Sequence, residues 1–249
     1  IEFNCPGDAL AVALLAALPE VTKAAPKVPE PSALRAAEGD SLTFRDIAMV
    51  MKRATGDTPV TFPALARSWP HDLWPQRDPL DFLGKDGGGG IGSGPGLAVG
   101  AALALEGSGR LVIATLGDGD TLMGVTALWT AAKYSLPVLF VIWNNRSYFN
   151  DELHQESVAQ HRGRNPDNAW VGQRLDDPAP DIAAMARSQG VEAAGPIKTH
   201  AELEKAMAAG VTALRDGRPH LIDVWIDSRQ GLAVSYSHHS LPTKSTGVC

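Results

Sequence analysis

Residues 111–119 read LVIATLGDG, an apolar run that ends in a glycine, an aspartate and a second glycine. Twenty-four residues separate this triplet from the pair Asn144-Asn145, which closes a second apolar run, PVLFVIW at 137–143. Each run is short, rich in strand-forming residues and bounded by turn residues, which is typical of a buried strand in a parallel sheet. Residues 122–134 carry apolar side chains at helical spacing. The pattern predicts a strand–helix–strand unit.

Polar residues follow both predicted strands. Crossovers between parallel strands place the two strand ends at one edge of the sheet, where ligands of open α/β sheets bind. Asp118 and Asn145 offer hard oxygen ligands, which suit Mg²⁺. A helix that starts near Thr121 would direct its N–H groups to the same place and favour a diphosphate there. Taken singly, the triplet is equally a tight turn and the asparagine pair a helix cap, but their combination favours a metal and phosphate site.

The segment from Gly117 to Asn145 resembles the thiamin-diphosphate-binding fingerprint, in which a GDG motif is followed by an NN motif. The intervening ALWTAAKY and FVI stretches look like the benzoylformate decarboxylase and acetolactate synthase branch of that family. The resemblance implies an α/β fold, a parallel sheet with helices on both faces, as the pyrophosphate-type domain. It also implies thiamin diphosphate and Mg²⁺ as cofactors.

The resemblance assigns particular residues to these cofactors. The implied metal ligands are Asp118, Asn145 and the main-chain carbonyl of Ser147. The implied cofactor-binding residues are Gly89, Gly90, Ile91, Gly117, Asp118, Gly119, Asp120, Thr121, Asn145, Ser147, Tyr148 and Phe149. Asp120 departs from the family pattern, which usually has Ser or Ala there; a helix N-cap is one interpretation, since Asp is a favoured cap. The segment 146–154 either lines the substrate site with its aromatic and ionisable residues or is a solvated helix whose Tyr148 and Phe149 pack into the core.

A glycine-rich stretch, GGGGIGSGPG at 87–96, precedes a predicted helix of small residues at 97–104. Glycine lets the backbone approach a ligand closely, although such a stretch is equally a flexible connector. By resemblance, Ile91 is the bulky residue that wedges beneath the cofactor and holds it bent, with the backbone of Gly89 facing the aminopyrimidine. Such a bend brings reacting groups together, which makes proton transfer effectively intramolecular.

Composition narrows the class of protein. The 249 residues are 44% hydrophobic and 20% charged, which is ordinary for a globular protein. The net charge of −6 argues against nucleic acid as a partner. Cys5 and Cys249 lie at opposite ends and predict no disulfide framework. No basic leader is seen and no apolar run approaches the roughly 18 residues of a membrane span, so we expect a cytoplasmic protein without a membrane partner.

The predicted organisation is that of part of a longer protein. The four segments expected are the end of a preceding middle domain (1–22), a linker with several prolines (23–40), the pyrophosphate domain (41–230) and a C-terminal tail that can act as a lid (231–249). The alternative for the first segment is a simple N-terminal arm. Further predicted elements are a helix from Ser41 to about Arg53, a strand at 57–62, helices at 181–189 and 199–215, and a strand at 219–226. Trp69 and Trp74 are interpreted as core or interface aromatic residues and not as ligands.

In the family that the chain resembles, a Glu from a pyrimidine-binding domain acts on the aminopyrimidine ring. The chain has no counterpart, so that domain must belong to the same protein or to another chain, in a homodimer or homotetramer. The function implied is a thiamin-diphosphate-dependent lyase or carboligase acting on a 2-oxo acid, of the decarboxylase or acetolactate-synthase type. The alternatives are a C–C hydrolase, a 2-hydroxyacyl-CoA lyase and a non-catalytic cofactor-binding subunit. A role for His154 or His161 as acid or base is left open.

Overall fold

The computed structural model describes residues 7–17, 41–67, 69–84 and 90–227. The chain divides into two compact units, Ile1–Glu30 and Pro31–Cys249. The first unit contains helix α1 (Gly7–Ala17). Three predicted features lie outside the described residues: the linker at 23–40, the cofactor-facing Gly89 and the tail at 231–249.

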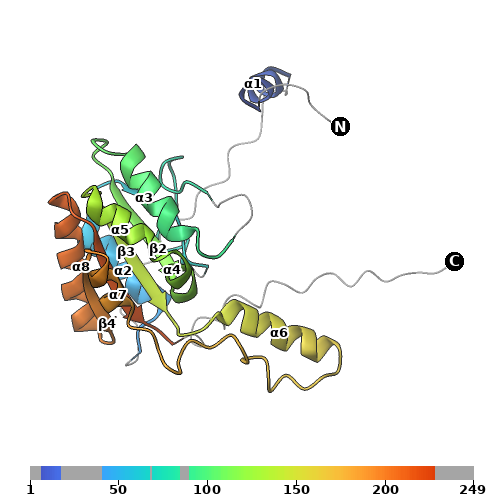
Figure 1. Cartoon of the computed structure of the whole chain (residues 1–249). Coiled ribbons are helices and arrows are strands. Elements are labelled where there is room, and N and C mark those ends of the chain that lie inside the picture. The colour runs from blue at the N-terminus through green and yellow to red at the C-terminus, as the bar shows by residue number, and fades with distance from the viewer. Residues whose placement is uncertain (1–6, 18–40, 68, 85–89, 228–249) are drawn as a thin grey trace. The chain divides into compact units, whose positions relative to one another are not determined.

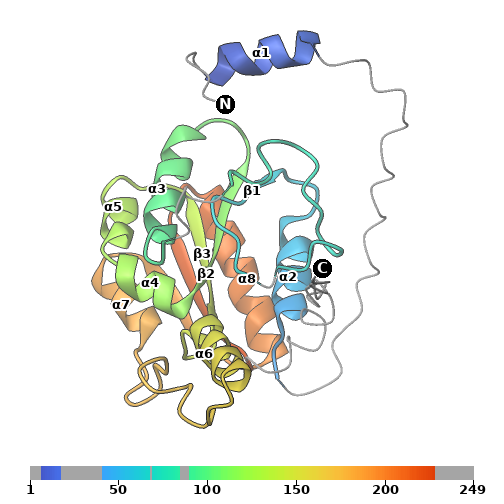
Figure 2. The same ribbon diagram turned by 90° about the vertical axis from the view of Figure 1, so that its right-hand side faces the viewer.

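The second unit is an α/β domain (Figure 1). Its elements in chain order are α2 (Phe44–Thr55), β1 (Val60–Thr61), α3 (Gly94–Ala104), β2 (Leu111–Gly117), α4 (Asp118–Gly124), α5 (Ala127–Lys133), β3 (Val138–Asn144), α6 (Phe149–His161), α7 (Ile182–Ser188), β4 (Glu192–Ile197), α8 (His200–Arg215) and β5 (His220–Trp225). The described strands form a parallel sheet in the order β1-β2-β3-β5-β4. Helices α3, α5 and α7 cover one face and α2 and α8 the other (Figure 2). The predicted fold class is confirmed.

Strand β3 shows why the strands read as continuous apolar runs. Leu139, Val141 and Trp143 pack in the cluster shared with α2 and α8. The alternate residues of the same strand pack in the cluster shared with α3, α5 and α7. Because successive side chains point to opposite faces, a strand covered on both sides must be apolar at every position.

The face covered by α2 and α8 is closed by well-capped helices and by aromatic residues. Each helix starts with a capping box, Thr43 with Asp46 in α2 and Thr199 with Glu202 in α8. Trp143 stacks on Phe44 with ring centroids 4.9 Å apart. The rings of Phe62, Trp69 and Trp74 pack against one another beside it. Trp69 is thus a core residue, and Trp74 is partly buried against the same cluster.

The helix between β2 and β3 differs from the prediction. Instead of one helix starting near Thr121, the chain forms α4, which starts at Asp118, and then α5. The break falls at Val125 and Thr126, where β-branched side chains follow Gly124 and the helix propensity is low. The first turn of α4 thus begins directly at the end of β2.

The two edges of the sheet also differ from the prediction. The strand predicted at 57–62 is reduced to β1, which pairs with β2 over two residues. Strand β4, with the sequence EAAGPI, was not predicted, since Ala, Gly and Pro are poor strand formers. Pairing with β5 at the sheet edge overrides that local preference, and Pro is tolerated at an edge.

Candidate functional site

The carboxyl ends of three strands meet at one edge of the sheet. Gly117, the last residue of β2, is in register with Trp143 in β3. Asn144, the last residue of β3, is in register with Trp225 at the end of β5. The first turn of α4 and the turn after β3 therefore start side by side.

Asp118 and Asn145 converge on one main-chain N–H group. The amide of Ser147 lies 3.1 Å from Oδ2 of Asp118 and 3.0 Å from Oδ1 of Asn145. The other carboxylate oxygen of Asp118 accepts from the amide of Gly119 (2.9 Å). The side-chain oxygens of Asp118 and Asn145 therefore lie close together, and oxygens of these two types are the ligands that a hard cation prefers.

The electrostatics of this edge also suit a cation. Burial raises the pKa of Asp118 to about 6, against hydrogen bonds from backbone amides that lower it. Burial likewise raises the pKa of Asp223 in β5 to about 6; its hydrogen bond with Asn144 lowers the pKa and the nearby charge of Asp118 raises it. Two buried carboxylates that disfavour each other's ionisation would both be stabilised by a bound cation. The donor chemistry and charge of the edge thus fit Mg²⁺.

Asp223 was missed by the sequence analysis. Its Oδ1 accepts a hydrogen bond from Nδ2 of Asn144 (2.9 Å), and Oδ1 of Asn144 accepts from the amide of Arg146 (3.1 Å). Arg146 has a φ of 58°, and its guanidinium lies 4.6 Å from the ring centroid of Trp225. The first asparagine of the pair thus fixes the turn that carries the second. The available signal was a lone carboxylate inside the apolar run of the last strand.

The interpretation of Asp120 as an N-cap is wrong. Gly117 occupies the N-cap of α4, and Asp120 is the third residue of the helix. The carboxylate accepts instead from the amides of Gly92 and Gly94, at 2.6 and 3.3 Å. Since these glycines flank Ser93 in the glycine-rich stretch, that stretch is joined to the edge of the sheet. The structure thereby brings the two predicted halves of the site together.

The remaining predicted cofactor residues surround α4. The hydroxyl of Thr121 donates to the carbonyl of Gly117 (2.8 Å) and is buried. A side chain at Gly119 would collide with the ring of Tyr148, so only glycine fits there. Gly90 is exposed, and Ile91 is 51% exposed. Phe149 is half-buried where α6 begins.

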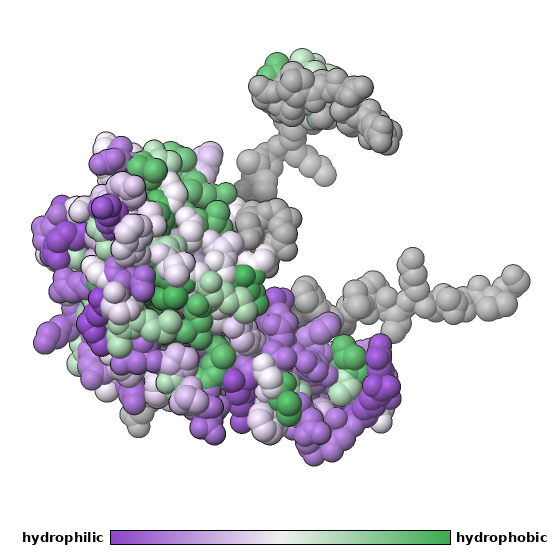
Figure 3. Space-filling model, viewed as in Figure 1, coloured by the Kyte–Doolittle hydropathy of each residue, from purple (hydrophilic) through white to green (hydrophobic). Residues whose placement is uncertain are grey.

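Several large apolar side chains are exposed near this edge and along α3, α4 and α5. They are Ile91, Leu97, Leu103, Met123, Trp129 and Tyr134. Figure 3 shows apolar residues gathered on this side of the domain. Several exposed apolar side chains on one side of a domain are compatible with an interaction face.

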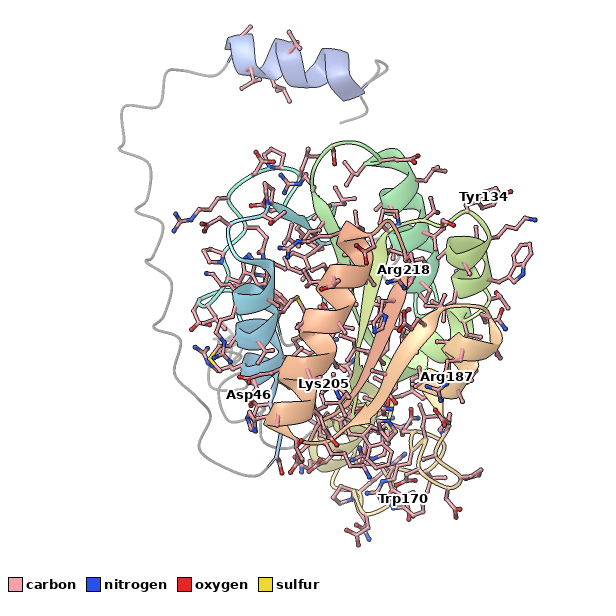
Figure 4. All side chains as sticks on the ribbon, turned by 90° about the vertical axis from the view of Figure 1, so that its left-hand side faces the viewer. Asp46, Tyr134, Trp170, Arg187, Lys205 and Arg218 are labelled. Atoms are coloured by element: carbon pink, nitrogen blue, oxygen red, sulfur yellow. The ribbon has the colours of Figure 1, made fainter. Side chains whose placement is uncertain are left out.

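Helix α6 is tied to the site only at its start. Glu152 is its buried residue and accepts from the hydroxyl of Ser147 (3.1 Å). Nη2 of Arg174 lies 3.6 Å from Oε1 of Glu152, and the guanidinium lies 5.1 Å from the ring centroid of Trp170. Figure 4 shows Trp170 beyond the end of the sheet. His154 and His161 are exposed. Tyr148 and Phe149 are half-buried, and a role for this segment in the substrate site stays a prediction.

The fold and the edge define an open parallel α/β domain with polar side chains gathered at the carboxyl ends of its central strands. Residues 65–224 match the thiamine pyrophosphate enzyme family, in its C-terminal TPP-binding domain. The chain therefore belongs to the thiamine pyrophosphate enzymes.

Individual relatives agree with this assignment. Benzoylformate decarboxylase of Pseudomonas aeruginosa is 39% identical over 136 residues, which cover 55% of the chain and 23% of the relative. The acetolactate synthase large subunit of Parasynechococcus marenigrum is 31% identical over 160 residues, which cover 63% of the chain and 24% of the relative. A 2-hydroxyacyl-CoA lyase of Oryza sativa is 29% identical over 170 residues, which cover 66% of the chain and 27% of the relative. The chain thus spans about a quarter of the length of these relatives.

Solved structures give the same picture. The thiamine diphosphate-dependent 4-hydroxybenzoylformate decarboxylase of Rhodococcus jostii superposes with a TM-score of 0.63 at 26% identity, covering 89% of the chain and 40% of that protein.

Within the described ranges, none of the helices has the length and apolar character that a membrane crossing requires.

Proposed function

We propose that this chain supplies the metal and diphosphate half of the active site of a thiamin-diphosphate-dependent lyase or carboligase that acts on a 2-oxo acid. The observation that carries the proposal is the convergence of Asp118 and Asn145 on the amide of Ser147. The relatives named decarboxylase and acetolactate synthase support the reaction class.

In this proposal Asp118 and Asn145 hold Mg²⁺ through their side-chain oxygens, and Ser147 contributes its main-chain carbonyl. The diphosphate would lie against the backbone amides of the first turn of α4, where Gly119 leaves room for the ring of Tyr148. Ile91 supports the cofactor from the glycine-rich stretch. When bound, thiamin diphosphate supplies an electron sink next to the carbonyl carbon of the substrate. The chain's own residues bind and orient it.

We further propose that a pyrimidine-binding domain completes the site. The exposed apolar residues of α3, α4 and α5 support a partner on this side of the domain. That partner would provide the Glu that this chain lacks, in a homodimer or homotetramer. A cytoplasmic location stays a prediction.

The test is a panel of 2-oxo acids and aldehydes assayed on the complete enzyme with Mg²⁺ and thiamin diphosphate. We expect CO₂ release or C–C bond formation with at least one 2-oxo acid, lost in Asp118→Ala and kept in the control Asp57→Ala, which removes an exposed carboxylate. Activity that is confined to 2-hydroxyacyl-CoA substrates would favour the second candidate, which the similarity to the rice lyase supports. Absence of turnover with all substrates, despite tight cofactor binding, would favour a non-catalytic subunit.

A further inference from the structure

The carboxylate of Asp120 joins two segments that are distant in the sequence. One oxygen, Oδ1, accepts from the amide of Gly92 at 2.6 Å and from the amide of Gly94 at 3.3 Å. Asp120 belongs to α4, while the two glycines lie in the stretch that leads into α3. Hydrogen bonds to an ionised acceptor are about twice as strong as neutral ones.

The two segments also fit sterically. Gly92 has a φ of +99°, and a Cβ added there would lie 2.9 Å from Cβ of Met123. A Cβ added at Gly94 would collide with the carboxylate of Asp120. On the side of α4, a Cβ added at Gly124 would lie 2.5 Å from the carbonyl oxygen of Gly92. The backbone of residues 92–94 therefore packs directly against α4, and the positive φ of Gly92 favours glycine there.

Ile91 is held by this arrangement from both sides. On one side, the amide of the next residue, Gly92, is bonded to Asp120. On the other, the hydroxyl of Ser93 donates to the carbonyl of Gly90 (2.9 Å) and closes a turn around Ile91. The side chain of Ile91 is half exposed, so core packing does not fix it.

We propose that Asp120 is a positioning residue that fixes the turn carrying Ile91 against the first turns of α4. A Ser or Ala side chain at this position is too short to place an oxygen where Oδ1 of Asp120 lies, so the link to Gly92 and Gly94 needs a side chain with the reach of Asp or Asn. Asp118 and Asp120 stand two residues apart in α4, so one short helix holds both the proposed metal ligand and the anchor of the wedge. The part of the proposal that concerns cofactor geometry rests on the proposed function; the anchoring itself does not.

The anchoring is tested by amide hydrogen exchange of the ligand-free chain. In Asp120→Ala we expect the amides of Gly92 and Gly94 to exchange roughly 10- to 100-fold faster than in the wild type, because a hydrogen bond to a charged group is lost. Asp120→Asn keeps an acceptor oxygen and should restore most of the protection. Asp57→Ala is the charge-matched control, and exchange in β3 reports that each variant is folded. Unchanged exchange at Gly92 and Gly94 in Asp120→Ala would overturn the proposal.

The positioning role is tested in the complete enzyme by separating turnover from affinity. We expect Asp120→Ala to lower kcat roughly tenfold while the Kd of thiamin diphosphate changes less than about threefold, with Asp120→Asn in between. Equal loss in kcat and affinity, or no rescue by Asn, would contradict it. If the wild type binds no thiamin diphosphate, the proposed function fails, whereas the exchange result still decides whether Asp120 anchors the turn.

Discussion

The face covered by α2 and α8 and the carboxyl edge of the sheet are built on opposite principles. The α2/α8 face buries aliphatic and aromatic side chains under helices with capping boxes. The carboxyl edge buries Asp118 and Asp223, whose pKa values burial raises to about 6. One region thus stabilises the fold, while the other keeps charges that cost stability and suit a ligand.

The largest effect is expected from a truncation on the α2/α8 face. Leu203 in α8 is fully buried in the cluster with β3 and β5. Leu203→Ala should lower the free energy of unfolding by about 2–5 kcal/mol, as expected for a buried leucine. Urea unfolding measures this, and the folded protein should keep its affinity for thiamin diphosphate. A loss below about 1 kcal/mol would show that this face is not the stabilising region.

Asn144→Ala should affect both stability and binding. It removes the partner of the buried Asp223 and the acceptor for the amide of Arg146. We expect a loss of about 1–3 kcal/mol in the free energy of unfolding, the cost of an unsatisfied buried group. Because the turn to Asn145 loses its support, Mg²⁺-dependent cofactor affinity should fall roughly 10- to 100-fold. Denaturation and calorimetry on the same variant check both, and intact affinity would separate Asn144 from the site.

Ile91→Ala should act on function without acting on the fold. Its side chain is half exposed, so the change in the free energy of unfolding should stay within about 0.5 kcal/mol. If Ile91 supports the cofactor, kcat of the complete enzyme should fall roughly tenfold, with little change in cofactor affinity. An intact kcat would remove Ile91 from the proposed site.

The smallest effect is expected from Asp118→Asn, which should raise the free energy of unfolding of the metal-free protein. The raised pKa of Asp118 means that the folded chain holds its proton more tightly than the unfolded chain. The free-energy cost of burying the ionised carboxylate is therefore fully present above pH about 6. It fades as the pH falls towards 3.8, the ordinary pKa of an Asp carboxyl. Asn removes this cost but loses one of two hydrogen bonds to backbone amides, so we expect a net gain of about 1 kcal/mol at pH 7.5.

Thermal unfolding at pH 7.5 and pH 4 checks that prediction. The gain should be present at pH 7.5 and should disappear or turn into a loss at pH 4, because the ionisation cost fades while the lost hydrogen bond remains. A variant that is less stable than the wild type at pH 7.5 would mean that Asp118 supports the fold and that the contrast between the two regions is wrong.

The long apolar runs at 111–116 and 137–143 predicted the central strands because both faces of each strand are covered, which leaves a strong local signal. The convergence of Asp118 and Asn145 followed from the topology of a parallel crossover. Strand β4 was not predicted because pairing with β5 overrides its weak local propensity. The break before α5 was also not predicted, although Gly124 and the two β-branched residues after it have low helix propensity.

The hydrogen-bond partners of Asp120 and Asp223 were also not predicted from the sequence. Asp120 bonds to amides 26 and 28 residues away, and Asp223 to a side chain 79 residues away. Side-chain partners at such separations follow from how the loops pack, which residue type and spacing do not report. The metal and cofactor roles of the predicted residues stay predictions.

The measurement that tests the central claim most directly is calorimetric titration of the complete enzyme with thiamin diphosphate, with and without Mg²⁺. The wild type should bind only when Mg²⁺ is present, Asp118→Ala and Asn145→Ala should each lose roughly 100-fold or more in affinity, and Asp57→Ala should bind normally. Wild-type affinity in Asp118→Ala, or binding that ignores Mg²⁺, would contradict the assignment of the carboxyl edge as the metal and diphosphate site.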